Sequence, residues 1–124
     1  MTDDDAIYAK SVRMPTFDGN EEEFQIFWVR YKAYAEVHAY AQALAVDQDM
    51  PADNTVLIDD NTALDKLQKM AVNRNKITMA NYTMAITSEG TISLIDEAES
   101  TEWPNGLACL VTAALNKRFM PQDT

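Results

Sequence analysis

Two side chains of this sequence, His38 and Cys109, are of types that often act as a general base or a nucleophile, and each type occurs once. His38 stands near the end of an aromatic-rich helical pattern, which favours a packing or boundary role. Cys109 lies between Ala108 and Leu110, and no basic residue is identifiable that would activate its thiol. A glycine-rich phosphate loop and a Gly-x-Ser-x-Gly elbow are both missing. The sequence therefore predicts no catalytic residues and a protein that is not an enzyme.

An acidic segment suggests calcium, because Asp47 and Asp49 match the first two ligand positions of an EF-hand loop. The match then fails. Pro51 stands at the third ligand position, Ala52 replaces the required glycine, and Ile58 replaces the bidentate glutamate. A lone cysteine and a lone histidine do not complete a zinc site without carboxylates or a second chain. We therefore expect no metal site and no cofactor.

The charge of the chain is strongly negative, at −10, and it is uneven. Residues 1–60 hold 13 acids and 4 bases, whereas residues 61–124 hold 7 acids and 6 bases. A free-standing domain that neutralises nucleic-acid phosphates is disfavoured, as is one that binds an anionic membrane. Solubility alone is an alternative explanation of the charge.

Lys66, Lys69 and Lys76 form a weakly basic strip on one face of a predicted helix. A solvated helix face is the simplest interpretation of this lysine strip. The alternatives are contact with RNA or with an acidic neighbour. If the neighbour is another copy of the chain, the acidic segment 46–60 is a suitable surface, and the contact is heterologous. The three lysines are therefore candidate homotypic contacts.

Length and composition indicate one folded domain, because the chain has 124 residues of which 47% are hydrophobic. Only 3 glycines and 4 prolines occur, which favours helix over sheet. No apolar run approaches the roughly 20 residues of a membrane span. The acidic N-terminus lacks the apolar core of a signal peptide, so we expect an intracellular protein.

The periodicity predicts an all-α fold, a compact bundle of about five helices with a short extended segment at its N-terminal end. We expect a flexible acidic tail over 1–11 and a helical domain over 12–124. The predicted segments are an extended piece over 12–17, helices over 20–38, 39–45, 61–87, 91–99 and 104–120, and an acidic surface loop over 46–60.

The predicted core depends on three helical stripes. The first helix places Phe24, Phe27, Trp28, Tyr31, Tyr34, Ala35 and His38 on one face, and Asn20 is suited to cap it with Glu23 in a capping box. The second long helix, capped by Asn61, is expected to bury Ala63, Leu67, Met70, Ile77, Ala80 and Met84. Pro104 is placed in the first turn of the last helix, which is expected to bury Leu107, Leu110, Val111, Ala114, Leu115 and Phe119.

Several phrases of the sequence together resemble a known family. Met14-Pro15-Thr16-Phe17-Asp18-Gly19, followed by Phe24 and Phe27-Trp28, resembles the opening of copia-type (Pseudoviridae) LTR retrotransposon Gag proteins. Trp103-Pro104-Asn105-Gly106 and the later run Ala113–Thr124, which contains Phe119, look like a second phrase of that family. Lys66–Glu89 looks like its long central helix. The resemblance covers about residues 12–124, and Phe17, Asp18, Gly19, Phe24, Trp28, Trp103, Pro104 and Phe119 carry it.

The resemblance implies the N-terminal lobe of a Gag capsid region, with a retroviral-capsid-like fold and a structural role. Such a lobe self-associates into a cytoplasmic virus-like particle that encloses the element's RNA. Its implied partners are other copies of itself and the second capsid lobe in cis. The zinc knuckle of the family is absent from this sequence, so RNA contacts are expected only through other regions, and no membrane contact is expected. A domesticated Gag lobe that binds a peptide or protein is the alternative, with a groove between the first and last helices.

Overall fold

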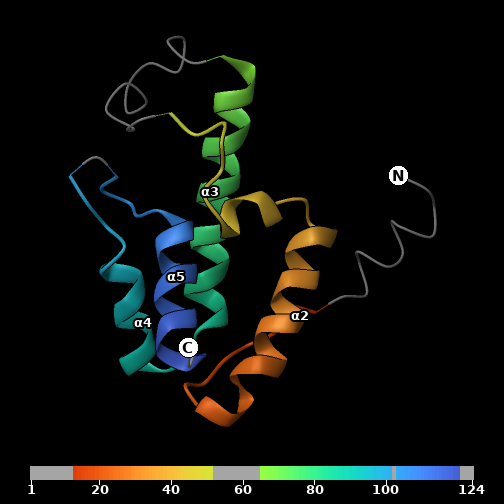
Figure 1. Ribbon diagram of the computed structural model, residues 1–124, viewed down its shortest axis with the longest axis vertical. Helices are drawn as coiled ribbons and strands as arrows, with labels where there is room; N and C mark the ends of the chain where they lie inside the picture. The colour runs from red at the N-terminus through yellow and green to blue at the C-terminus, as the bar shows by residue number, and fades with distance from the viewer. Residues whose placement is uncertain (1–12, 52–64, 102, 121–124) are drawn as a thin grey trace.

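The computed structural model describes residues 13–51, 65–101 and 103–120, and this part of the chain is all-α (Figure 1). Its elements are the 3-10 turn η1 (Glu21–Glu23), helix α2 (Phe24–Val37), the 3-10 turn η2 (Ala41–Leu44), and helices α3 (Lys66–Ala85), α4 (Glu89–Asp96) and α5 (Ala108–Phe119). The predicted all-α fold is thereby confirmed, but the described residues hold four α-helices, and the helix predicted over 39–45 is the 3-10 turn η2. The predicted tail 1–11, most of the acidic loop 46–60, the proposed cap Asn61 and the final Pro121–Thr124 lie outside the described residues.

Helices α3 and α5 lie side by side in the centre of the bundle, with α4 along one side of them and α2 on the other (Figure 1). The turn η2 contacts α2, α3 and α5. The residues of η2, which follow α2, therefore pack across both central helices.

The start of the first helix was predicted only in part. Asn20 caps the 3-10 turn η1 and bonds to Glu22, not to Glu23 as the predicted capping box requires, and α2 itself begins at Phe24 without a side-chain cap. The Asn20 side chain caps the first turn by accepting a hydrogen bond from the Glu22 N–H at 3.1 Å, while Glu21, Glu22 and Glu23 lie at the positive end of the helix dipole. The aromatic face is buried at Phe24, Phe27, Trp28, Tyr31 and Ala35. Tyr34 is only partly buried and His38 is exposed, so the buried face ends one turn earlier than expected.

Phe17 is 1% exposed and is the point where the two ends of the domain meet. Its ring centroid lies 5.2 Å from that of Phe24, 5.3 Å from that of Phe27 and 4.8 Å from that of Phe119. Its backbone N–H donates to the carbonyl of Ala85 at 2.8 Å, and its carbonyl accepts from the Thr87 N–H at 2.9 Å. This isolated parallel bridge to Ile86 fixes the extended segment against the end of α3. Phe17 therefore packs on the aromatic face of α2.

The buried face of α3 differs from the predicted one. The helix buries Ala71, Asn75, Thr78, Tyr82 and Ala85, whereas the side chains expected inside are exposed. Leu67, Met70, Ile77, Ala80 and Met84 all lie on the outer side, and Ala63 lies outside the described residues. Small and hydroxyl side chains allow α3 to approach its neighbours closely, and the aromatic rings of α2 fill the core in place of its large aliphatic groups. The helix also begins later than expected, at a capping box formed by Asp65 and Gln68.

Two boundaries in the second half of the chain were predicted wrongly. Gly90 was expected to form a turn but lies in the first turn of α4, because the Ser88 hydroxyl caps that helix by accepting from the Thr91 N–H. Pro104 was expected in the first turn of the last helix but lies in a turn before it, which the Gly106 N–H closes by donating to the Trp103 carbonyl at 2.8 Å. Helix α5 buries Ala108, Val111 and Leu115, and Leu110 is exposed.

Asn75 connects α3 to the start of α5. Its side-chain N–H donates to the Gly106 carbonyl at 3.1 Å, and its side-chain oxygen accepts from the Ala108 N–H at 2.7 Å. Leu107, the N-cap residue of α5, provides no side-chain cap. A side chain from another helix thus replaces the missing cap and satisfies two backbone groups at a buried helix end.

We predict that Asn75→Ala lowers the free energy of unfolding by about 2–3 kcal/mol, because it leaves two buried backbone groups without partners. Chemical denaturation followed by circular dichroism measures this change. The matched control is Asn81→Ala on the same helix, whose side chain bonds only to the Ile77 carbonyl at an exposed position. An equal loss in both variants would contradict the bridging role of Asn75.

Three buried tyrosines differ in their hydrogen bonding. The Tyr82 hydroxyl and Thr112 Oγ1 are 2.5 Å apart, whereas the Tyr31 and Tyr40 hydroxyls are buried without a hydrogen-bond partner among the described residues. Burial raises the pKa of Tyr31 and of Tyr82 well above the ordinary value, and it raises that of Tyr40 to about 12. All three phenols are therefore neutral at physiological pH.

The unpartnered hydroxyl makes Tyr31→Phe a favourable substitution. We expect it to leave the free energy of unfolding unchanged or to raise it by up to about 1 kcal/mol, since it removes a buried polar atom with no partner. Tyr82→Phe loses its bond to Thr112 and is expected to cost about 1 kcal/mol. Urea denaturation of both variants tests this, and a loss on Tyr31→Phe as large as that on Tyr82→Phe would contradict it.

Candidate interaction surfaces

The two residues considered for catalysis lie in unremarkable surroundings. His38 is the exposed C-cap of α2, and its ring packs on that of Tyr34 with centroids 4.2 Å apart. Cys109 is half-buried in the first turn of α5, where burial raises the pKa of its thiol. In residues 13–51, 65–101 and 103–120, no cluster of three or more His, Cys, Asp or Glu side chains has the geometry to hold a metal ion.

The carboxylates considered for calcium serve a different purpose. Asp47 is buried and accepts two hydrogen bonds on one oxygen from Arg74, at 2.9 Å from Nε and 2.8 Å from Nη2. Its other oxygen accepts from the Asp49 N–H at 3.1 Å, and the Asp49 carboxylate lies 3.8 Å from the same guanidinium. The start of the acidic segment is thus anchored to α3 by an internal ion pair. Asp47 was expected in a surface loop, and its burial against Arg74 corrects that expectation.

The phrase Phe17-Asp18-Gly19 has a clear structural role. Asp18 accepts a hydrogen bond from the Asn20 N–H at 2.9 Å, which forms a tight turn before α2. Gly19 has a φ of +93°, and a Cβ there would lie 2.8 Å from the Ser88 hydroxyl oxygen. The turn therefore needs glycine twice, for its backbone conformation and for its close approach to the start of α4.

The other residues of the resemblance are divided between core and surface. Phe24 and Trp28 stack in the core, with centroids 6.1 Å apart, and Trp103 is buried. Phe119 also stacks on Phe24, with centroids 5.2 Å apart, whereas Pro104 is exposed. Phe24 and Phe119 thus pack against each other between α2 and α5, where the groove was expected.

The lysine strip, formed by Lys66, Lys69 and Lys76, is exposed along α3 as the sequence suggested. The strip lies beside Met70, Ile77 and Met84, which are exposed and seven residues apart. Helix α3 carries four of the ten basic residues of the chain and none of its twenty acids. The structure thus places a basic and partly apolar helix face on an acidic body. Sequence reasoning missed this face because it assigned the same apolar residues to the core.

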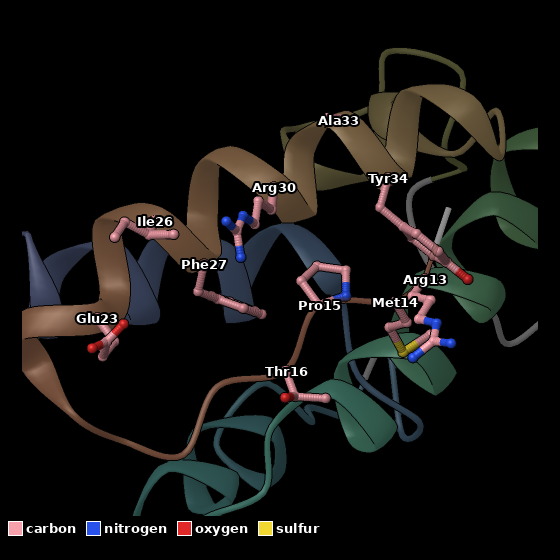
Figure 2. Close-up of a pocket in the computed structure, with 10 residues that line it drawn as sticks. All are labelled: Arg13, Met14, Pro15, Thr16, Glu23, Ile26, Phe27, Arg30, Ala33 and Tyr34. Carbon is pink, nitrogen blue, oxygen red and sulfur yellow. The ribbon is translucent and has the colours of Figure 1, made fainter. Parts of the chain in front are cut away.

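A groove of about 520 Å³ lies between α2 and the extended segment 13–16 (Figure 2). Its lining combines apolar side chains with two arginines and one glutamate, from Arg13, Met14, Pro15, Thr16, Glu23, Ile26, Phe27, Arg30, Ala33 and Tyr34. Arg30 extends from α2 toward the extended segment, and Arg13 lies beside Met14 at the end of that segment away from Arg30 (Figure 2). The sequence offered one signal of this groove, which is that Arg13 and Arg30 are both found in its acidic first half. No role was predicted for either arginine from the sequence.

Comparison with known proteins finds no matching family model, no similar curated protein and no similar solved structure. Among the described helices, none has the length and apolar character needed to cross a membrane.

The raised pKa of Cys109 leads to a prediction about its reactivity. Because burial holds less of the thiol as thiolate at a given pH, we expect iodoacetamide at pH 8 to alkylate folded protein more slowly than urea-unfolded protein. The rate should rise with pH beyond the range where an exposed cysteine has levelled off. Mass spectrometry of timed samples measures it, and equal rates in the folded and unfolded chains would contradict the burial.

Proposed function

We propose that this domain is a structural capsid lobe of a copia-type retrotransposon Gag, which self-associates into the shell of a virus-like particle around element RNA. The observation that carries the proposal is the outward apolar and basic face of α3, since a shell subunit acts through its exposed surfaces. The arrangement of Phe17 and Phe119 also supports it, because the two phrases that resemble Gag pack against each other at 4.8 Å.

The proposed mechanism is assembly by many weak contacts rather than by one strong contact. A rigid aromatic core holds the surfaces of each lobe in a constant relative position. Joining such a lobe to a second capsid lobe in the same chain converts weak contacts into avidity. The RNA is held by other regions of the Gag polyprotein in this proposal, because the acidic body of the lobe repels phosphate. The particles are expected in the cytoplasm.

The second candidate function is a domesticated Gag lobe that binds a peptide, and the groove beside α2 favours it. Arg13 and Arg30 suit an acidic extended segment, while Ile26 and Phe27 suit an apolar side chain within it. Binding of acidic peptide libraries, compared between the natural protein and Arg30→Glu, measures this function. Equal binding by the two proteins would remove the groove as the site.

The lysine strip provides the test of the capsid proposal. We expect Lys69→Glu with Lys76→Glu to lower particle yield at least several-fold, because it reverses charge beside the apolar residues of α3. Lys66 is left unchanged, since a glutamate in the first turn of a helix would itself be stabilising. Sedimentation and negative-stain electron microscopy measure the yield over a range of protein concentrations.

The matched control reverses Arg30 and Lys32, which are exposed inside α2, away from its ends, and change the net charge equally. Equal effects of the two double variants would attribute the loss to net charge and not to α3. A longer parent chain that carries both capsid lobes and still stays monomeric at every concentration would contradict the capsid proposal itself.

A further inference from the structure

Asn105 is the only asparagine of the sequence that is followed by glycine, and this neighbour suits a spontaneous reaction. The backbone nitrogen of the next residue can attack the side-chain carbonyl carbon of an asparagine, which closes a succinimide ring and releases ammonia. Glycine after the asparagine favours this attack, because it has no side chain to hinder the approach. Asn105 is exposed, so water can reach the ring and hydrolyse it.

Hydrolysis of the succinimide consumes one water molecule and has two products. Opening at the backbone carbonyl leaves isoaspartate, in which the main chain continues through the former side-chain carbonyl. Opening at the other carbonyl leaves aspartate. Both products replace a neutral amide with a carboxylate, and the reaction needs water but no oxidant or reductant. Isoaspartate also lengthens the main chain by one carbon atom.

The folded turn opposes the first step of this reaction. Residues 103–106 form a β-turn with Pro104 in its second position and Gly106 in its last, which are the places that type I turns prefer for these residues. The Gly106 N–H donates to the Trp103 carbonyl at 2.8 Å, so the nitrogen that would attack is held in a hydrogen bond. Ring closure requires rotation about the Asn105 Cα–C bond, and this rotation breaks the turn.

Contacts with α3 hold Gly106 in this conformation. Gly106 is buried with a φ of +91°, and a Cβ there would lie 2.6 Å from Met79 Cε. Its carbonyl accepts from the Asn75 side chain at 3.1 Å, and the same side chain accepts from the Ala108 N–H at 2.7 Å. Rotation of the peptide between Asn105 and Gly106 is thus coupled to the bonds that Asn75 makes. The junction of α3 with the start of α5 therefore controls whether Asn105 can reach the reactive geometry.

We propose that Asn105 is a deamidation site that the folded domain protects, and that it reacts with water when the turn over 103–106 separates from α3. The isoaspartate product disfavours closing of the turn again, because an extra main-chain atom lies between Trp103 and Gly106, which are both buried. Deamidation is irreversible, so it records each lasting opening of this junction. The proposal goes beyond the capsid function and does not require it.

The two products differ in their expected effect on the fold. Asn105 is exposed shortly before the start of α5, where the positive end of the helix dipole is compatible with a carboxylate. The aspartate product should therefore be tolerated. The variant Asn105→Asp carries the charge of both products without the change in the main chain, and it is the matched control for isoaspartate.

Incubation at pH 8 followed by peptide mapping with mass spectrometry measures deamidation at Asn105. We expect the folded protein to react at least about tenfold more slowly than urea-unfolded protein, since only the opened turn reacts. Asn75→Ala should raise the rate in the folded protein at least several-fold, whereas Asn81→Ala, on the same helix, should leave it unchanged. Equal rates in the folded and unfolded proteins, or no reaction in the unfolded protein, would overturn the proposal.

The dependence of the rate on urea separates local opening of the turn from unfolding of the whole domain. Local opening exposes little surface, so low concentrations of urea should change the rate at Asn105 only weakly. This holds for the natural protein and for Asn75→Ala, even though the variant is less stable. A rate that rises in step with the globally unfolded fraction in both proteins would overturn the role of the junction.

The effect of the product is tested on aged protein. Ion exchange separates the deamidated forms, and electron-transfer mass spectrometry distinguishes isoaspartate from aspartate at position 105. We expect the isoaspartate form to unfold at a lower thermal midpoint than the natural protein, and Asn105→Asp to unfold at nearly the natural midpoint. Equal midpoints for the isoaspartate form and Asn105→Asp would show that the longer main chain does not keep the turn open, and would overturn that part of the proposal.

Discussion

Burial of the Phe17 ring is the interaction on which the described structure depends. It joins the segment before α2, the aromatic face of α2 and the last turn of α5, which are far apart in the chain. The same residue pairs its backbone with Ala85 and Thr87 at the end of α3. One residue thus ties both ends of the domain and the central helix together. The turn that follows it packs against the start of α4, because Gly19 approaches Ser88 closely.

The aromatic core explains why α3 leaves its large apolar residues outside. Rings from Phe17, α2 and Phe119 occupy the volume that aliphatic side chains of α3 would otherwise fill. The inner face of α3 contributes small or hydrogen-bonding side chains, and Asn75 uses both ends of its amide to hold the start of α5. Arg74 holds the start of the acidic segment through Asp47. Hydrogen bonds and an ion pair from α3 therefore hold the segments packed against it, while its large aliphatic residues lie on the surface.

This division of roles gives the proposed capsid function a physical basis. A domain that assembles must keep a rigid interior and still present apolar groups to a partner. Here the rigidity comes from buried aromatic rings and the surface comes from the outer side of one long helix. The same helix carries four bases on an otherwise acidic chain, and in the proposed function an acidic surface of another subunit is what these bases would contact.

Much of the fold could be predicted from local sequence patterns, because tertiary contacts did not change the structure that these patterns favour. Four features were predictable because each is encoded within a few residues: the aromatic stripe of α2, the Asn20 cap of η1, the Asp18-Gly19 turn, and the helix carrying Val111 and Leu115. The face of α3 that is buried could not be predicted in this way. Its sequence offers two stripes, one large and aliphatic and one containing Ala71, Asn75 and Tyr82, and periodicity alone favours the more hydrophobic. In the structure the stripe with Ala71, Asn75 and Tyr82 is buried instead. The aromatic rings fill the core, and Asn75 has its buried hydrogen-bond partners on that side of the helix. The groove between α2 and residues 13–16 likewise exists only because Phe17 is anchored to Ile86 across a long stretch of chain.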